Sequence, residues 1–364
     1  MNLIGEHTDY SDGFCLPVAI DRECRITATP SDDGQIRATS AQLAGEVIVD
    51  AATADPLPGS ARWGSFVTGA VAAVRDRGHT IDGMHLAIDS SVPAGAGLSS
   101  SSALAVALTL LFLPINAPER NDLRDIARLA LAAEVRATGV PGGLLDQMAS
   151  LGGREGHALL LDCRALTIDP VRLPDDLTIL VIHSGVERAL ADSAYAARRA
   201  SCEAAARRIG VDKLRDARLD QVGDDPFARH VVTENARVLE FCDVLRAPEA
   251  DRDHRLGELL LASHESLRDD FEVSTPELDV LVEQAVAAGA IGARLTGAGF
   301  GGCIVALAPK ATAAACLDGA MTAYRTMSER NPMGFIAHAA PGALASPKSI
   351  PTTPLKQSAA GADV

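Results

Sequence analysis

Aromatic residues and basic residues are both scarce in this sequence. Phe, Trp and Tyr make up only 3% of the 364 residues, and 33 Lys+Arg stand against 48 Asp+Glu, which gives a formal net charge of −15. Binding to nucleic acid or to an anionic membrane needs a positive surface that displaces counterions. We therefore expect neither partner, and a small-molecule substrate is the better expectation.

Close cysteine pairs and long apolar runs are also lacking. The seven cysteines lie singly along the chain, without the spacing of a zinc site or of a CxxC redox motif. Such cysteines are typical of small buried side chains in a reducing compartment, so we expect a cytoplasmic protein. No apolar run approaches about 18 residues, and the first residues lack the basic segment and apolar core of a signal peptide. We expect neither a membrane span nor a leader.

Hydrophobic residues make up 47% of the chain, which is enough apolar surface to drive folding at this length. Two periodicities alternate along the sequence. Apolar and alternating runs predict strands at residues 14–28, 46–50, 84–89, 157–162, 177–183 and 303–308. Helical spacing predicts helices at residues 63–77, 102–112, 121–138, 189–209, 228–245, 255–270 and 276–288. We therefore predict an α/β (α+β) chain.

The segment at residues 164–176, which contains two prolines, is the best candidate for a domain junction. It divides the chain into a first domain at residues 1–168 and a second domain at residues 169–340. Residues 341–364 are rich in Ala, Pro, Ser, Thr and Gly and have little apolar periodicity. They predict a flexible tail.

A glycine- and serine-rich segment at residues 93–102 reads Pro-Ala-Gly-Ala-Gly-Leu-Ser-Ser-Ser-Ser and precedes a predicted helix. Glycines let a loop bring its backbone N–H groups close to an anion, and the start of a helix adds a positive dipole end. The serine hydroxyls can bind phosphate oxygens or Mg²⁺. A flexible turn that caps a helix is the alternative interpretation.

The segment Gly5-Glu6-His7-Thr8-Asp9-Tyr10 places two carboxylates and an imidazole within four residues. Such a group can hydrogen-bond several sugar hydroxyls at once. A metal site is less attractive, because no second cluster has ligand spacing. A solvated polar turn is the other alternative.

Asp146 follows a Pro-Gly-Gly turn and falls in the first turn of a predicted helix, where the helix dipole favours a carboxylate. An aspartate held there can accept a hydroxyl proton or orient a hydroxyl for in-line attack on a phosphoryl group. Glu134, on the preceding helix, can face the same site. A helix-initiating acid is the alternative.

Further along, four glycines at residues 297–302 permit close approach to a ligand or to the other domain, or form a tight turn.

These four segments, in this order and spacing, resemble the GHMP kinase superfamily, whose motifs are matched by residues 2–10, 93–102 and 296–302. Residues 5–10 match the signature of the galactokinase family within it. Residues 193–203, with Ser-Ala-Tyr, and residues 263–278, with Ser-His-Glu-Ser-Leu-Arg-Asp-Asp, are similar to that family too. The resemblance covers about residues 1–340.

The resemblance implies the two-domain GHMP kinase fold, with a phosphate-binding loop in the N-terminal domain, a ferredoxin-like C-terminal domain and an active site between them. It implies that ATP, with Mg²⁺, phosphorylates the anomeric hydroxyl of D-galactose to give α-D-galactose 1-phosphate, the first step of galactose catabolism. The chain itself is expected to be a monomer or a weak homo-oligomer.

The resemblance also implies roles for individual residues. Asp146 would be catalytic. Galactose would contact Glu6, His7, Asp9, Gly143 and Tyr195. ATP would contact Pro93, Gly95, Ala96, Gly97, Leu98, Ser99, Ser100, Ser101, Ser102, Gly297 and Gly299, with Trp63 packed on the adenine. Mg²⁺ would be placed by Ser101 and Glu134.

Two alternatives remain open. The substrate can be a related sugar, such as N-acetylgalactosamine or arabinose, because the space near the second carbon of the sugar cannot be read from a sequence. The chain can also be a catalytically weak galactose-sensing regulator. One departure bears on activity: the family pattern has an arginine two residues before Asn2, which this chain lacks. We hypothesise that the natural start lies upstream, and that the chain as given is weakly active or poorly stable.

Overall fold

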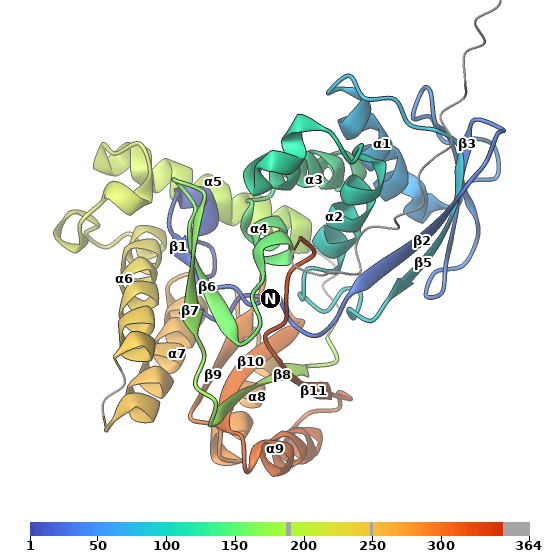
Figure 1. The fold of residues 1–364 in the computed structure, drawn as a ribbon. Helices are drawn as coiled ribbons and strands as arrows, with labels where there is room; N and C mark the ends of the chain where they lie inside the picture. The colour runs from blue at the N-terminus through green and yellow to red at the C-terminus, as the bar shows by residue number, and fades with distance from the viewer. Residues whose placement is uncertain (187–190, 248–249, 345–364) are drawn as a thin grey trace, which may run out of the picture.

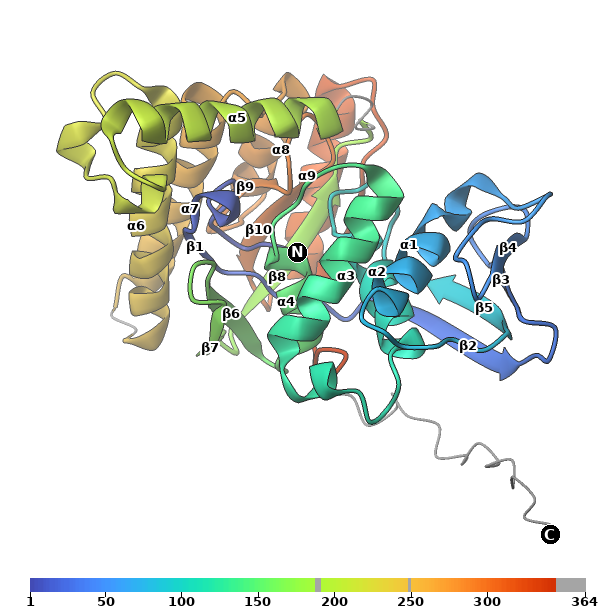
Figure 2. The ribbon, with the colours of Figure 1, turned by 90° about the horizontal axis from the view of Figure 1, so that it is seen from above.

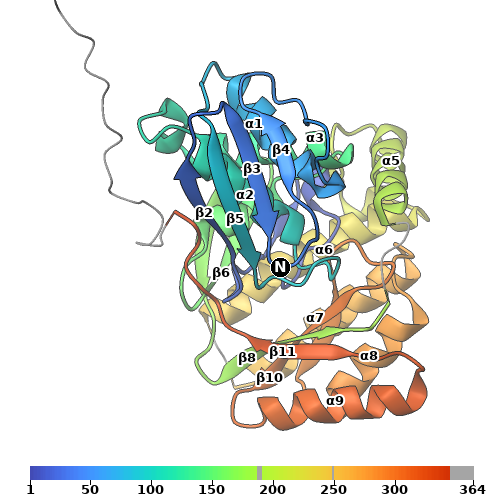
Figure 3. The same ribbon diagram turned by 90° about the vertical axis from the view of Figure 1, so that its right-hand side faces the viewer.

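The computed structural model describes residues 1–186, 191–247 and 250–344. These residues form three sheets with helices packed on them, and the N-terminus lies between the sheets in all three views (Figures 1–3). Segments that are far apart in the sequence therefore meet at the N-terminal segment.

The first sheet has the order β2-β5-β3-β4, in which β3 and β5 are parallel and the other pairs antiparallel. Its strands are β2 (Cys24–Pro30), β3 (Gln35–Ser40), β4 (Val47–Asp50) and β5 (Met84–Ser90). Ile36, Ala38, Val47 and Val49 are fully buried, at every second position of their strands. Helices α1 (Ser65–Arg75), α2 (Ser100–Phe112) and α3 (Leu123–Thr138) pack together on that face, and Figure 3 looks onto the other one.

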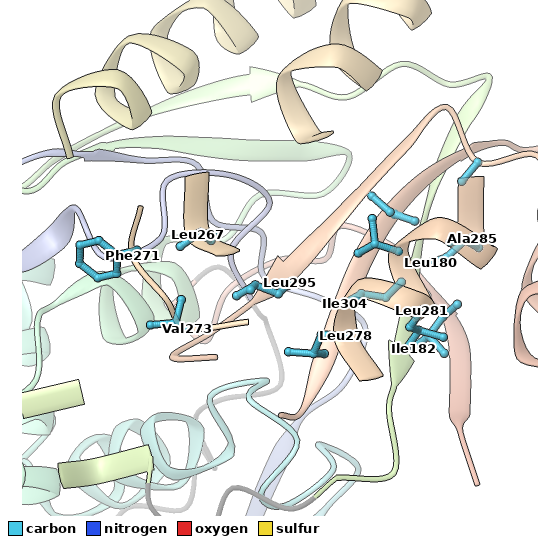
Figure 4. Packing of buried hydrophobic residues seen from close by; sticks show 14 of the residues in the cluster. Leu180, Ile182, Leu267, Phe271, Val273, Leu278, Leu281, Ala285, Leu295 and Ile304 are labelled. Atoms are coloured by element: carbon cyan, nitrogen blue, oxygen red, sulfur yellow. The ribbon is translucent and has the colours of Figure 1, made fainter. Parts of the chain in front are cut away.

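The second sheet is antiparallel with the order β11-β8-β10-β9. Its strands are β8 (Leu177–His183), β9 (Gly292–Thr296), β10 (Cys303–Pro309) and β11 (Met333–Ala337). Helices α7 (Arg252–Asp269), α8 (Pro276–Ala287) and α9 (Ala313–Met327) cover one face. Figure 4 shows Leu180, Ile182 and Ile304 of the strands packed against Leu278 and Leu281 of α8.

The opposite face of the second sheet is buried by the beginning of the chain. Val181 and Val305 of the sheet belong to the same buried cluster as Leu3 and Ile4, together with Phe241 of α6 (Pro226–Arg246). A strand buried on both faces reads as a continuous apolar run rather than an alternating one. This explains the uninterrupted apolar sequence of β8.

A third, small sheet has the order β1-β6-β7 and joins the beginning of the chain to its middle. Its strands are β1 (Phe14–Cys15), β6 (His157–Asp162) and β7 (Thr167–Arg172). Helix α6 packs against β1 and β7. The remaining elements are α4 (Leu145–Gly152), α5 (Ala191–Ile209) and the short 3-10 helices η1 (Asp9–Ser11), η2 (Arg62–Gly64), η3 (Pro118–Asn121), η4 (Leu214–Asp216) and η5 (Leu219–Gln221).

Most predicted helices and strands are present, with shifts of a few residues at their ends. Three long helices begin at capping residues: Asp122, Asp225 and Thr275 each accept a backbone hydrogen bond from the first turn. The predicted strand at residues 14–28 is two strands, β1 and β2, and β3, β7, β9, α9 and β11 were not predicted.

The segment predicted as a domain junction, residues 164–176, contains β7, which pairs with β6 along its whole length. The predicted boundary at residue 168 falls inside this strand, and the division into two domains stays a prediction. Gly342 and Ala343 of the predicted tail donate backbone hydrogen bonds of 2.8 Å to Gly153 and Ser150. The remainder of the tail, residues 345–364, lies outside the described residues.

Among the helices that the structure describes, none is both long and apolar enough to cross a membrane.

Candidate active site

A cavity of about 470 Å³ lies where the N-terminal segment meets both glycine-rich loops. It brings together most of the site residues predicted from the sequence. The lining residues are Asn2, Glu6, His7, Asp9, Gly95, Gly97, Ser99, Ser100, Ser101, Ser102, Leu131, Glu134, Thr138, Val140, Gly142, Gly143, Leu145, Asp146, Gln147, Tyr195, Gly297 and Ala298.

Asp9 lies directly against the backbone of Gly143. A Cβ atom added at Gly143 would overlap Oδ2 of Asp9 and would lie 2.8 Å from its Cγ, so a larger residue there would displace the Asp9 carboxylate. Asp146, in the first turn of α4, is close enough to act on Asp9 electrostatically. Burial, and then the charge of Asp146, raise the pKa of Asp9 to about 7. One end of the cavity therefore holds two interacting carboxyl groups beside an exposed stretch of backbone.

Glu6 joins the N-terminal segment to the second glycine-rich loop. Its Oε1 accepts hydrogen bonds from the backbone N–H of Gly297 (2.7 Å) and the hydroxyl of Thr296 (3.1 Å). Its Oε2 accepts one from the amide of Asn2 (3.2 Å). The guanidinium of Arg294, which is fully buried, lies 3.6 Å from Oε1. Glu6 thus has a structural role, and Oε2 keeps acceptor capacity for a ligand.

His7 makes a second link to the same loop. Its Nε2 lies 3.2 Å from the carbonyl oxygen of Ala298, and its Nδ1 lies 2.9 Å from the hydroxyl of Tyr10. Because a carbonyl oxygen only accepts, Nε2 carries the proton and Nδ1 accepts from Tyr10. Burial lowers the pKa of His7 to about 3, so the imidazole is neutral near pH 7. The ring of Tyr195, 5.6 Å from that of His7 between centroids, completes this wall.

Three buried residues of α6 hold the N-terminal segment from behind, and the sequence analysis did not identify them. The contacts are Gly5 N–H to Glu234 Oε1 (2.9 Å), Phe14 N–H to Asn235 Oδ1 (2.8 Å) and His230 Nε2–H to Glu6 O (3.1 Å). Their helical spacing on the otherwise apolar side of the predicted helix is the sequence pattern that could have identified them.

Glu234 is fully buried and therefore needs a compensating charge. Burial alone would raise its pKa, but Arg237, whose Nε lies 2.7 Å from Oε2, acts together with His230, Arg294 and the hydroxyl of Ser263, and their combined effect lowers the pKa of Glu234 to about 2. A carboxylate that is charged throughout the physiological range thus anchors the backbone at Gly5.

The glycine- and serine-rich loop divides into residues that line the cavity and residues that anchor it. Gly95, Gly97 and the serines at 99–102 line the cavity. Ala96 and Leu98 point the other way, into the cluster beneath the second sheet, where they are 3% and 4% exposed. Pro93 is also absent from the lining residues. The loop ends at Ser99, and its serines open α2, so N–H groups and hydroxyls face the cavity at a helix N-terminus.

Glu134 of α3 faces these serines across the cavity. Its Oε2 accepts hydrogen bonds from the hydroxyl of Ser102 (2.8 Å) and from the amide of Gln147 (2.6 Å). Burial raises the pKa of Glu134, and the hydrogen bonds from the two serines, Ser101 and Ser102, act against that rise. Gln147 was not predicted as a site residue. Its position directly after Asp146 in the sequence could have identified it as a site residue.

Two further predicted nucleotide contacts lie away from the cavity lining. The indole N–H of Trp63 donates to the carbonyl oxygen of Ala44 (3.2 Å), and its ring packs on the core beneath the first sheet. Gly299 has φ +81°, and a Cβ atom there would overlap the carbonyl oxygen of Val273. The N–H of Phe300 donates to the same oxygen (2.7 Å), so this part of the loop is tied to the segment that follows α7.

The chain is similar to known proteins over most of its length. The family model described as GHMP kinases N terminal domain matches residues 65–154, the one described as GHMP kinases C terminal matches residues 247–324, and the Galactokinase galactose-binding signature matches residues 1–30. Galactokinase of Roseiflexus sp. is 42% identical over 94% of this chain and 90% of its own length. Galactokinase of Mycobacterium tuberculosis is 43% identical over 94% and 96%.

Solved structures show the same likeness. A galactokinase of Lactococcus lactis complexed with galactose has a TM-score of 0.85 at 31% identity, over 94% of this chain and 92% of that one. A mevalonate kinase of L. major in complex with R-mevalonate has a TM-score of 0.65 at 18% identity, over 93% and 94%, which shows the fold alone. The sequence identity over nearly the whole chain, together with the cavity that joins the three motifs, establishes that this chain belongs to the galactokinase family of the GHMP kinases.

Proposed function

We propose that this chain transfers the γ-phosphoryl group of ATP to the anomeric hydroxyl of D-galactose. One observation carries the proposal: Asp146, the Asp9–Gly143 contact and the serine-rich loop all face the same cavity. Phosphoryl transfer depends mainly on positioning the two reactants in line and on neutralising charge. A single cavity with sugar-binding groups at one end and phosphate-binding groups at the other meets both requirements.

The sugar is placed by Asp9, Glu6, His7 and Tyr195. Asp9 and Oε2 of Glu6 accept hydrogen bonds from sugar hydroxyls, and the N–H of Gly143 donates to one. The links of Glu6 and His7 to residues 296–298 hold these groups rigid before the sugar arrives. Groups that are already in place lose little conformational entropy on binding.

Asp146 orients the anomeric hydroxyl and accepts its proton as the oxygen attacks phosphorus. Its place in the first turn of α4 points the positive end of that helix towards the carboxylate. The proton moves to a carboxylate oxygen, and the bond between the γ-phosphorus and its bridging oxygen breaks to release ADP.

The phosphates of ATP lie along Gly95, Gly97 and the first turn of α2, where backbone N–H groups and serine hydroxyls face the cavity. Among the described residues no group of three or more His, Cys, Asp or Glu side chains forms a metal site. Mg²⁺ in a kinase needs only one or two protein oxygens, because phosphates and water supply the others, and Ser101 and Glu134 fit that need. When bound, Mg²⁺ neutralises charge on the phosphates.

Turnover by an Asp146→Asn variant tests the proposal. We expect the variant to bind galactose in calorimetry within about threefold of the unchanged protein, while ADP release falls by at least about a thousandfold. Asp175→Asn is the matched control, because Asp175 is 84% exposed at the surface and pairs only with Arg172 among the described residues. ADP release by Asp146→Asn close to that of the control would refute the assignment.

A panel of sugars in the same assay defines the substrate. D-galactose should give the highest kcat/KM, with N-acetylgalactosamine and arabinose lower. A higher kcat/KM for either of these sugars would show that this sugar, and not galactose, is the substrate. If no sugar causes ADP release, the result would favour a galactose-sensing regulator. We further propose a cytoplasmic protein that is a monomer or a weak homo-oligomer, since the described cysteines are all free thiols and the net charge of the chain is −15. Size-exclusion chromatography with light scattering measures the oligomeric state.

A further inference from the structure

Gln147 follows Asp146 in the sequence, and its side chain contacts Glu134. Its side chain is 1% exposed, and its Nε2 lies 2.6 Å from Oε2 of Glu134 and 3.4 Å from the hydroxyl of Ser102. The orientation of the amide follows from this contact, because an amide oxygen in the same place would face a carboxylate oxygen. Gln147 therefore donates to Glu134.

Two of the donors to Glu134 converge on one oxygen. Ser102 (2.8 Å) and Gln147 (2.6 Å) both bind Oε2. A glutamate side chain has three rotatable bonds, and holding one carboxylate oxygen at two points fixes the direction of the other. Oε1 is thus the oxygen that is left to face a cation in the cavity.

The amide oxygen of Gln147 is a cost to stability in this arrangement. Oε1 of Gln147 is buried and has no hydrogen-bond partner among the described residues. A buried polar atom without a partner costs about 1–3 kcal/mol. An apolar residue of the same length would avoid this cost, so the glutamine is explained by what it does to Glu134.

We propose that Gln147 is a positioning residue for the divalent cation: it orients Glu134 so that Oε1 binds the Mg²⁺ of the nucleotide complex. The inference rests on the proposed function, in which Glu134 binds Mg²⁺. Groups that orient a metal ligand typically change metal affinity by 10–100-fold when they are removed.

The test is direct binding of Mn²⁺, a paramagnetic substitute for Mg²⁺, measured by electron paramagnetic resonance with a non-hydrolysable ATP analogue present. Gln147→Met keeps the length of the side chain and removes the donor. We expect the affinity for Mn²⁺ to fall by about tenfold or more, while the thermal midpoint stays within about 2 °C or rises. Gln284→Met, a half-buried glutamine of α8 outside the cavity lining, is the matched control.

A double-mutant cycle identifies the route of the effect. If Gln147 acts through Glu134, Gln147→Met has no further effect on Mn²⁺ affinity in a Glu134→Gln background. In turnover, half-maximal rate should require about tenfold more Mg²⁺, with kcat restored at saturating Mg²⁺ and the KM for galactose unchanged.

The outcomes separate the two proposals. Additive effects, or Mn²⁺ affinity unchanged by Gln147→Met while Glu134→Gln weakens it, would overturn the role of Gln147 alone. Unchanged affinity in Glu134→Gln and Ser101→Ala would overturn the metal site in the proposed function, and the inference with it. If Gln147→Met does not fold, Ser102→Ala removes the other donor to Oε2 and must weaken Mn²⁺ binding for the inference to stand.

Discussion

The carboxylate of Glu6 and the backbone N–H of Gly297 form a hydrogen bond of 2.7 Å, although 291 positions of sequence separate the two residues. The bond joins the segment that carries the sugar-binding groups to the glycine-rich loop that follows β9. Together with the contact between His7 and Ala298, it makes the two walls of the cavity a single unit. The predictions that follow test the parts of this unit.

Glu6→Ala should lower the free energy of unfolding by roughly 3–5 kcal/mol, because it leaves the buried guanidinium of Arg294 without this carboxylate. Urea denaturation measures the change. Glu46→Ala is the control, since Glu46 pairs with Arg37 at the surface and its loss should cost about 1 kcal/mol or less. Equal effects of the two substitutions would contradict the structural role given to Glu6.

Gly143→Ala should raise the KM for galactose by about tenfold or more with little change in the KM for ATP, because the new Cβ displaces the carboxylate of Asp9. Steady-state kinetics with each substrate varied in turn measure both constants. Gly142→Ala is the neighbouring comparison: its Cβ would meet only Leu131 Cδ1, at 3.5 Å, an ordinary contact. The prediction fails if the two variants have the same KM for galactose.

Galactose binding should strengthen as the pH rises through about 7. Burial and Asp146 raise the pKa of Asp9 from 3.8 to about 7, and the ionised form is the better acceptor for a sugar hydroxyl. If only that form binds, the KM for galactose falls by about tenfold between pH 6 and pH 8. His7 adds no step in this range, because its pKa is about 3. Asp9→Asn should remove the pH dependence, and a profile that survives this substitution would assign it to another group.

The raised pKa of Asp9 also predicts how the stability of the sugar-free protein depends on pH. A carboxyl group whose pKa is higher in the folded state binds its proton more tightly there, so its protonation stabilises the fold. This contribution is complete below the unfolded value of 3.8 and is lost as the pH rises through about 7. Asp9→Asn should therefore lessen the loss of stability between pH 5 and pH 8, as measured by thermal unfolding without ligands.

Tyr10→Phe should lower stability by about 1–3 kcal/mol and also raise the KM for galactose, because it leaves Nδ1 of the buried His7 without a donor. Tyr324→Phe is the matched control: the hydroxyl of Tyr324 donates to the carbonyl oxygen of Ser184 (2.8 Å), away from the cavity lining. It should lose stability with an unchanged KM. A KM change of the same size in both variants would show that only stability had been lost.

Local sequence patterns predicted most of the elements that position the site. The loop glycines and the apolar run of β8 depend on neighbouring residues alone. Strand β7 was not predicted, because Pro170 normally interrupts strands. Pro170 is tolerated because β7 lies at the edge of its sheet: the N–H of its partner Leu159 donates to Pro17 on the other side of β6, so no hydrogen bond to β6 is needed from the backbone nitrogen of Pro170.

The sequence by itself determined which segments carry chemistry: the sugar signature, the serine-rich loop, Asp146 and the family to which they belong. Only the tertiary structure decided how these segments are held. The packing decided which loop residues face the cavity and which ones, such as Ala96 and Leu98, anchor the loop in the core. It also placed Glu234 behind Gly5, and Gln147 against Glu134. The physical reason is that a motif records the chemistry of adjacent residues, whereas a buried hydrogen bond depends on two surfaces that meet only when the whole chain has packed.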